Sequence, residues 1–376
     1  MKVTAAVLYR EGEPKPYSQS QPLKVMEVDL EGPGSNEVLV HIKAAGLCHS
    51  DLSVINGSRP RPLPMVLGHE ASGIVVKVGP AVTRVQTGDH VIFSFVPMCG
   101  HCEKCLSGQP YLCIPGQKAN AQATLLGGGV RFKTSDGQRL YHHVGVSAFS
   151  TYTVTHEASL VPVDQTLPLE KAALFGCAVM TGVGAVVNTA QVKPGSSVAV
   201  FGMGGVGLSV VMGARASGAW PVVAVDVVEA KLGLAQQVGA THCIKADENV
   251  VEAIRDLTEG GAEYAFEAVG NGNVLSQAYV ATRPGGTTIS IGLPHPKSEL
   301  SLKAVTLVAE GRHLVGSYMG SSVPIRDIPR YVKLYRAGLL PVDRLLTSVI
   351  TMEQVNSGFD KLDHGKQVRQ IIRFSE

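Results

Sequence analysis

The chain has 376 residues, a length that predicts two or three domains and is sufficient for a large hydrophobic core. Its 33 Lys and Arg residues against 31 Asp and Glu residues leave a formal net charge of +2, which argues against a nucleic-acid-binding groove. The hydrophobic fraction of 45% and the charged fraction of 17% exclude a mostly disordered chain.

Glycine and cysteine are the two residue types with unusual counts. Glycine accounts for 42 of the 376 residues, or about 11%, against a usual share of about 7%. This excess indicates tight turns, or backbone that another group approaches closely. Seven cysteines is an odd number, which fits a disulfide framework poorly. We therefore expect reduced thiols or metal ligands.

Targeting and membrane signals are weak. Residues 1–10 lack the apolar core of a signal peptide, which predicts a cytoplasmic location. Lys193 is the only charged residue between positions 172 and 214, and it separates two uncharged stretches of 21 residues, about the length of a membrane span. Because Asn188, Gln191 and several glycines interrupt them, the stretches resemble a buried strand, turn and helix. We predict no membrane segment.

The chain up to about position 170 has the pattern of a β-rich domain. Val38, Val40 and Ile42 alternate with Leu39, His41 and Lys43, which is the period of two expected of a strand. Residues 72–79 form a second short apolar run next to glycines. Frequent Pro and Gly residues between such runs indicate turns.

A cluster of cysteines lies within this region. The pattern C-x2-C-x2-C-x7-C comprises Cys99, Cys102, Cys105 and Cys113. Four thiolates at this spacing fill the tetrahedral shell of one zinc ion, which is typical of a structural site. An iron–sulfur cluster, which also takes four cysteines, is the alternative, and disulfides are a third. We favour zinc.

From about residue 178 apolar runs alternate with helical segments. The runs are residues 198–201, 222–225, 242–244, 264–266, 288–291 and 313–315. Helical candidates such as 229–238 and 250–257 lie between them. This rhythm predicts an α/β domain, 178–321, with a doubly wound parallel sheet of about six strands. The last part, 322–376, contains a helix at 328–336 and a strand at 368–374, and we expect it to return to the first domain, 1–177.

A glycine-rich motif follows the first of these strands. Residues 202–207 read G-x-G-x-x-G between strand 198–201 and helix 208–216, the context of a dinucleotide-binding site. Gly202 permits the tight turn, Gly204 lets backbone approach a pyrophosphate, and Gly207 lets helix and strand pack closely. The N–H groups at the helix start, from Gly205 and Val206, favour a phosphate.

Asp226 ends the next strand along the chain after the glycine motif. An acid at this position binds the ribose 2′-hydroxyl and repels a 2′-phosphate. Val227 and Val228 offer no arginine to receive such a phosphate. The predicted cofactor is therefore NAD and not NADP.

Three cysteines lie outside the cluster, at Cys48, Cys177 and Cys243. An isolated cysteine is usually a small buried hydrophobic residue, and we expect this for Cys243 in its apolar strand. Cys48, His69 and Cys177 are too far apart in the sequence for spacing alone to show that they meet.

The motifs taken together resemble those of the zinc-dependent alcohol dehydrogenases of the medium-chain dehydrogenase/reductase family. The resemblance runs from residues 3–7 to 365–369 and rests on Gly68-His69-Glu70, the four-cysteine cluster, the segment 177–182 and the glycine motif. It implies a GroES-like catalytic domain and a Rossmann domain. It also implies two zinc ions per chain, with the catalytic one bound by Cys48, His69 and Cys177 and one position open for the alcohol.

The resemblance also implies roles for neighbouring residues. Ser50 takes the substrate proton, Asp51 orients His69, and Glu70 approaches the metal during ligand exchange. The implied cofactor contacts are His49, Thr181, Val206, Lys231 and Arg369. Animal members of the family have a histidine that releases the proton at the position of Ser53, so the resemblance does not define the exit route here. His49 stands where many members have arginine, and is a weaker clamp on the pyrophosphate.

The implied substrate pocket is lined by Phe95, Leu293 and Tyr318, with Arg59 near its mouth. Apolar lining favours primary alcohols and aldehydes, medium-chain or aromatic. The alternative is S-(hydroxymethyl)glutathione, the substrate of the formaldehyde branch. That branch has a cation just past the last cysteine of the cluster, where this chain has Gln117.

Other assignments differ in their metal content. A quinone reductase of the same fold lacks both sets of zinc ligands. A zinc-ribbon interaction protein would bind one zinc ion, and this interpretation leaves the glycine motif unexplained. The long segment between Cys113 and Ser147 resembles dimeric family members. We therefore expect a homodimer, with a tetramer as the alternative.

Overall fold

The computed structural model describes residues 1–365 and 367–374. Lys366, which belongs to the C-terminal motif quoted above, lies outside them. The chain forms two compact units. The first contains Met1–Cys177, Val323–Pro329 and the described residues from Leu346 onward, and the second contains Ala178–Ser322 and Arg330–Leu345.

The first unit is built from β-strands. One group closes into a barrel in the order β1 (Lys2–Leu8), β2 (Leu23–Leu30), β7 (Phe132–Lys133), β8 (Arg139–His142) and β4 (Met65–Val66). The other is a sheet in the order β10 (Leu160–Val163), β6 (His90–Phe93), β5 (Glu70–Val78), β3 (Glu37–Gly46), β18 (Arg369–Arg373) and β17 (Leu346–Ile350), with β9 (Tyr152–His156) pairing with β3. The strand predicted at 38–43 lies within β3, and the one predicted at 72–79 overlaps β5, which ends at Val78.

Strand β3 is the centre of the second sheet. It pairs antiparallel with β5, where Gly46 faces Glu70, and with β18, where Gly46 faces Ile371. Cys48 follows the end of β3, His69 precedes β5, and Arg369 begins β18. The strand pairing therefore brings three distant parts of the sequence together at the C-terminal end of β3.

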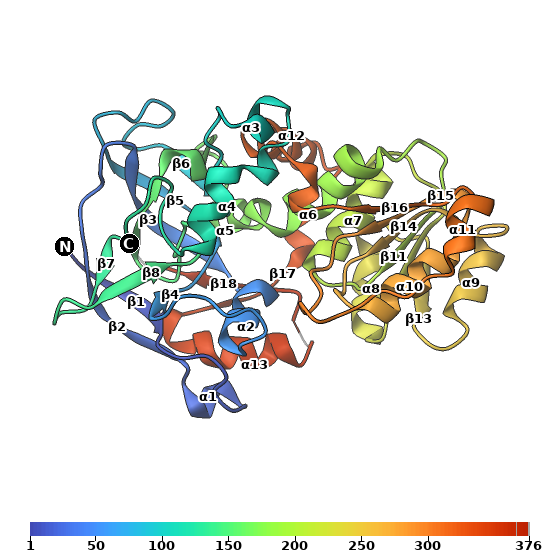
Figure 1. Ribbon diagram of the computed structural model, residues 1–376, viewed down its shortest axis with the longest axis horizontal. Helices are drawn as coiled ribbons and strands as arrows, with labels where there is room; N and C mark the ends of the chain where they lie inside the picture. The colour runs from blue at the N-terminus through green and yellow to red at the C-terminus, as the bar shows by residue number, and fades with distance from the viewer. Residues whose placement is uncertain (366, 375–376) are drawn as a thin grey trace. The chain divides into compact units, whose positions relative to one another are not determined.

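The second unit contains the predicted parallel sheet, which is thereby confirmed (Figure 1). Its order is β13 (His242–Lys245), β12 (Val222–Asp226), β11 (Val198–Phe201), β14 (Ala262–Glu267), β15 (Thr282–Ser290) and β16 (His313–Gly316). Helices α7 (Gly205–Ala216), α8 (Glu229–Gln237), α9 (Val250–Leu257) and α10 (Gly272–Ala281) pack against it. The direction of the chain's progress reverses between β11 and β14, and ligands bind at such switch points.

The C-terminal part differs from the expectation that all of 322–376 joins the first unit. Helix α12 (Pro324–Arg336) belongs to the first unit only up to Pro329. Its later half packs in the second unit, where Asn188 donates a hydrogen bond to the Tyr331 hydroxyl at 3.3 Å. Periodicity in the sequence predicts a helix here, but it does not show which unit each part of the helix packs in.

The remaining helices are short. They are α1 (Tyr17–Ser20), α2 (His49–Ile55), α3 (Glu103–Leu106), α4 (Ile114–Ala121), α5 (Leu169–Ala173), α6 (Ala178–Gly184), α11 (Ala304–Ala309) and α13 (Val355–Asp363). Among the described residues no single helix has the length and apolar character to cross a membrane, although the bent pair Leu169–Gly176 and Ala178–Ala190 passes on length and composition.

Candidate metal and cofactor sites

Cys48, His69 and Cys177 come together in the first unit. Their ligand atoms all lie within 4.8 Å of one another. The three residues are at most 6% exposed. Cys48 lies at the start of α2, His69 lies directly before β5, and Cys177 follows the short helical turn Leu174–Gly176. Folding therefore assembles a site that such long separations in sequence could not reveal.

The donor set of this cluster fits zinc. A hydrogen bond from Cys177, followed by the nearby Arg369 cation, lowers the pKa of Cys48 well below its usual value despite burial. The same hydrogen bond and burial raise the pKa of Cys177. Two sulfurs and one imidazole nitrogen leave one of four tetrahedral positions open, as in catalytic zinc sites. Two thiolates also balance the +2 charge of the metal.

Asp51 lies behind His69 and is fully buried. Its carboxylate oxygens are 3.2 and 3.1 Å from His69 Nδ1, and Oδ1 accepts the Gly68 N–H at 3.1 Å. Burial opposes ionisation, but the imidazoles of His69 and His143 hold the pKa of Asp51 far below its usual value. Asp51 in turn raises the pKa of His69 despite burial, which makes that ring a stronger metal ligand.

Sequence reasoning missed His143. Its Nδ1 lies 3.1 Å from Asp51 Oδ1, and its ring meets the His69 ring edge-on, with centroids 5.5 Å apart. Burial lowers the pKa of His143, although the hydrogen-bonding and charge of Asp51 oppose the shift. No local motif marks the residue, because the sequence shows only two adjacent histidines.

The adjacent imidazole, His142, points elsewhere. Its Nε2 accepts the Arg131 backbone N–H at 3.1 Å. Burial, followed by the Arg131 cation, lowers the pKa of His142 from 6.5 to about 3. The unfolded chain therefore binds a proton at this position as pH falls below 6.5, while the folded chain does not until about pH 3. Stability from this group is complete above pH 6.5 and is lost as pH falls toward 3.

We expect H142Q, which keeps an acceptor for the Arg131 N–H, to flatten this pH dependence. From pH 6.5 to 4.5 the parent should lose about 2 kcal/mol more unfolding free energy than the variant. Urea midpoints at several pH values measure the difference. Parallel profiles for parent and variant would contradict the assignment.

Glu70 and Arg369 form a buried pair beside the cysteines. Arg369 Nε is 3.4 Å from Glu70 Oε1, and Nη2 is 3.9 Å from Cys48 Sγ. Burial raises the pKa of Glu70 to about 7, although Arg369 opposes the shift. The approach of Glu70 to the metal and the contact of Arg369 with a cofactor phosphate stay predictions.

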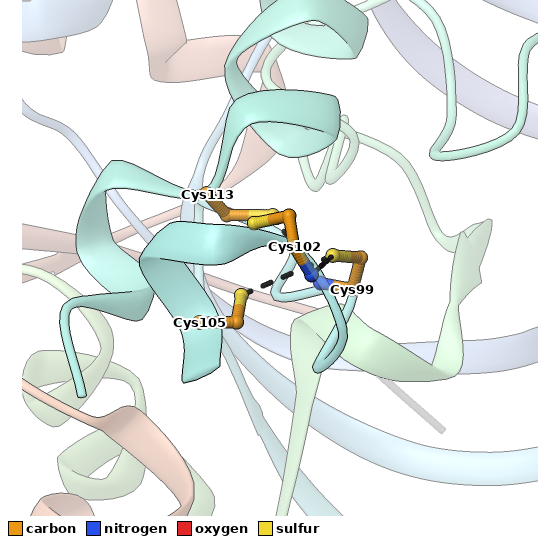
Figure 2. A group of neighbouring side chains, drawn as sticks. All are labelled: Cys99, Cys102, Cys105 and Cys113. Atoms are coloured by element: carbon orange, nitrogen blue, oxygen red, sulfur yellow. Dashed lines mark hydrogen bonds between the residues drawn. The ribbon is translucent and has the colours of Figure 1, made fainter. Parts of the chain in front are cut away.

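The four-cysteine cluster forms a second metal-binding group. Figure 2 shows the side chains of Cys99, Cys102, Cys105 and Cys113 turned toward a common centre. Their sulfurs lie within 4.8 Å of one another. Backbone N–H groups support them, since Cys102 donates to Cys99 Sγ and Cys99 to Cys113 Sγ, each at 3.3 Å. Four sulfur donors fill a tetrahedral shell, which fits a structural zinc.

The other predicted residues of the first unit lie around α2 and β6. His49 and Ser50 are exposed in the first turn of α2. Ser53 donates its hydroxyl hydrogen to the His49 carbonyl at 2.8 Å. The Phe95 ring meets the His69 ring edge-on, with centroids 5.6 Å apart. Phe95 is therefore adjacent to the group of potential zinc ligands formed by Cys48, His69 and Cys177.

The glycine motif fits a dinucleotide phosphate. Gly202 has a φ of +94°, which a glycine adopts without strain. A side chain at Gly207 would lie 1.8 Å from the Gly202 carbonyl oxygen, so only glycine allows α7 to pack there. A Cβ at Gly204 would meet nothing within 4 Å, which leaves the backbone there accessible.

Asp226 is bonded to the glycine loop. Its carboxylate accepts the N–H of Met203 at 2.6 Å and of Val228 at 2.8 Å. It thereby ties the end of β12 to the start of the motif. Lys231 lies in the first turns of α8, and Thr181 lies in α6. Their cofactor contacts, like that of Val206, stay predictions.

The proposed pocket residues Leu293 and Tyr318 belong to the second unit, where they are 57% and 39% exposed. Their contact with substrate stays a prediction.

Cys243 corrects one expectation. It was predicted to be a buried hydrophobic residue, but it is exposed. The reason is that β13 is the edge strand of the sheet and only partly covered. An apolar run in the sequence does not distinguish an edge strand from a central one.

Comparison with known proteins gives consistent matches along the chain. Residues 34–165 match the family model of the alcohol dehydrogenase GroES-like domain, and residues 205–337 that of the zinc-binding dehydrogenase. The chain is 39% identical to S-(hydroxymethyl)glutathione dehydrogenase of Paracoccus denitrificans and 38% identical to alcohol dehydrogenase class-3 of Cereibacter sphaeroides, with 100% of each chain covered.

Two solved structures are similar over 100% of both chains. An alcohol dehydrogenase zinc-binding domain protein from Burkholderia ambifaria has a TM-score of 0.94 at 37% identity. Benzyl alcohol dehydrogenase from Acinetobacter calcoaceticus has a TM-score of 0.91 at 33% identity.

Proposed function

Because the chain belongs to the zinc-dependent alcohol dehydrogenases of the medium-chain dehydrogenase/reductase family, we propose that it oxidises S-(hydroxymethyl)glutathione with NAD as hydride acceptor. The buried cluster of Cys48, His69 and Cys177 carries the chemistry. Zinc bound there lowers the pKa of an alcohol hydroxyl and polarises a carbonyl. From the sequence alone this substrate ranks second to neutral alcohols, and the name of the Paracoccus denitrificans relative supports ranking it first.

The chain's own residues have distinct tasks in this reaction. Cys48 and Cys177 supply negative charge, and Asp51 keeps the His69 ring oriented. The backbone of the glycine motif receives the cofactor phosphates at the start of α7. The family assignment sets aside the quinone reductase and zinc-ribbon interpretations.

Arg61 supports a substrate that carries carboxylates. The residue is half-buried, and its Nη1 donates a hydrogen bond to the Asn120 carbonyl at 3.5 Å. Asn120 donates to the Phe95 carbonyl at 2.7 Å, which connects Arg61 to the ring that meets His69. After burial, the positive charge of Arg61 also contributes to lowering the pKa of His143. Within the part of the chain that the structure describes, no carboxylate pairs with Arg61, so its guanidinium can receive one from a ligand.

We expect R61Q to raise KM for S-(hydroxymethyl)glutathione about 10- to 100-fold, because a charge-assisted hydrogen bond contributes about 1.5–3 kcal/mol. KM for benzyl alcohol, which has no carboxylate, should change less than about twofold. Steady-state kinetics of NAD reduction with both substrates tests this. An equal rise in both KM values would remove Arg61 from substrate recognition.

A neutral primary or aromatic alcohol is the second candidate. Gln117 is uncharged at the position where the formaldehyde branch has a cation, and benzyl alcohol dehydrogenase is among the similar structures. The deciding experiment is NAD reduction with primary, secondary, long-chain and benzylic alcohols, and with formaldehyde in the presence and absence of glutathione. A kcat/KM for benzylic alcohols that exceeds the glutathione-dependent value would select the second candidate.

We also propose that the protein is a cytoplasmic homodimer. The cysteines are free, which is usual in a reducing compartment. Among the described residues β16 pairs on one side only, with β15. Helix α11 exposes Val305 by 67% and Val308 by 87%. An unpaired strand edge and apolar side chains are features that a second copy covers.

Light scattering should give about twice the chain mass of 39.6 kDa. The double variant V305D/V308D should shift the protein toward the monomer. A parent protein that runs as a monomer or a tetramer would contradict the dimer.

A further inference from the structure

Three nitrogen atoms surround the buried carboxylate of Asp51. The Gly68 N–H donates to Oδ1 at 3.1 Å, and His69 Nδ1 lies 3.2 and 3.1 Å from the two oxygens. His143 Nδ1 completes the set at 3.1 Å from Oδ1. A carboxylate that is shielded from water needs polar neighbours, so each of these nitrogens contributes to holding Asp51 in place.

An ionised carboxylate can only accept hydrogen bonds. Nδ1 of His69, which is hydrogen-bonded to Asp51, must therefore carry the hydrogen. For His69 this leaves the lone pair on Nε2, the nitrogen available to a metal on the far side of the ring. The contact with Asp51 thus determines which tautomer of His69 is present.

The His69 ring is also held by its neighbours. The His143 ring packs at 90° to it with centroids 5.5 Å apart, and the Phe95 ring packs at 85° with centroids 5.6 Å apart. His143 therefore acts on His69 in two ways, directly through the ring contact and indirectly through Asp51.

The backbone of His143 is anchored to the segment that precedes His69. Its N–H donates to Ser147 Oγ at 2.9 Å, and the Ser147 hydroxyl donates to the Val66 carbonyl at 2.8 Å. The N–H of Ala148 donates to the Gly68 carbonyl at 3.0 Å. These bonds fix the turn 143–148 against residues 66–68, so the backbone of His143 is held next to the segment that precedes His69.

From these contacts we infer that His143 is a positioning residue of the catalytic zinc site, which holds Asp51 and thereby the metal-binding orientation of His69. The inference depends on zinc at the Cys48, His69 and Cys177 cluster but not on the choice of substrate. Its effect is expected on the retention and geometry of the metal.

The test compares three variants of the zinc-loaded protein. H143L removes the donor, H143N keeps an N–H close to the position of Nδ1, and H142L removes the neighbouring buried imidazole, which does not face Asp51. The measurement is the rate at which each zinc ion passes to an excess of a colorimetric chelator. The ion of the four-cysteine cluster serves as an internal reference.

We expect H143L to release the catalytic zinc about 10- to 100-fold faster, since loss of a residue that orients a ligand typically has this effect on metal affinity. H143N should stay within about threefold of the parent, and H142L should match the parent even if it melts earlier. The reference zinc should be released at the parent rate in all three.

Cobalt substitution supplies a second measurement. The visible absorption of Co²⁺ at the catalytic site should shift in H143L and return toward the parent spectrum in H143N. Unchanged release and spectrum in H143L would overturn the inference, as would equal acceleration in H142L. Failure of the glutathione substrate would leave all these measurements unaffected, so the two proposals fail separately.

Discussion

The variant C177A is expected to contain one zinc per chain and to lose about a thousandfold or more in kcat/KM. The three ligand atoms lie within 4.8 Å of one another, and removal of one leaves two protein ligands for the catalytic ion. A thousandfold loss corresponds to about 4 kcal/mol, within the several kcal/mol that metal-ion stabilisation of a transition state contributes. Metal analysis of the purified protein and NAD reduction measure the two effects.

The matched control is C243A. Cys243 is exposed on β13 and belongs to no group of potential metal ligands among the described residues. This variant should contain two zinc ions and retain the parent activity. A C177A protein that keeps both zinc ions and full activity would refute the assignment of the catalytic site.

The variant C105A is expected to lose the zinc of the four-cysteine cluster and to lower Tm by about 10 °C or more. Structural zinc contributes folding free energy directly, and about 1 kcal/mol corresponds to 2–4 °C in a unit of this size. The helices α3 and α4 lie next to these cysteines. Because both helices are short, they have few hydrogen bonds of their own to keep them folded without the metal. Differential scanning calorimetry with and without added zinc measures the loss.

The catalytic ion serves as the control here. C105A should still contain about one zinc per chain, because Cys48, His69 and Cys177 come from other segments. C177A should melt close to the parent by comparison. If C105A retains two zinc ions or the parent Tm, the cluster is not a closed structural site.

Sequence patterns identified the elements that depend on local spacing. The four-cysteine cluster lies within the short segment from Cys99 to Cys113, and the glycine motif joins one strand to one helix. Each is contained in a single local unit, so its geometry follows from neighbouring residues. The parallel sheet was predictable for the same reason, because each strand and helix repeats one local rhythm.

Contacts between distant segments were not predictable in this way. His143 approaches Asp51 only because residues 143–148 are bonded to the segment 66–68. Arg61 is connected to Phe95 through Asn120, which lies on α4. The predicted burial of Cys243 was wrong because β13 is an edge strand. The order of strands is a property of the whole sheet and cannot be read from one apolar run. The division of α12 between the two units is likewise a packing result.

By itself the sequence determined the cysteine cluster, the dinucleotide motif and the preference for NAD over NADP, since these depend on residue types at short separations. Through resemblance it also pointed to Cys48, His69 and Cys177. Only the tertiary structure decided that these three meet, that Arg369 and Glu70 lie beside them, and that Asp51 is shared by two histidines. The physical reason is that antiparallel pairing of β3 with β5 and β18 brings Cys48, His69 and Arg369 together, and a linear pattern does not encode that register. Cys177 and His143 reach the site on separate turns, which local patterns do not place either.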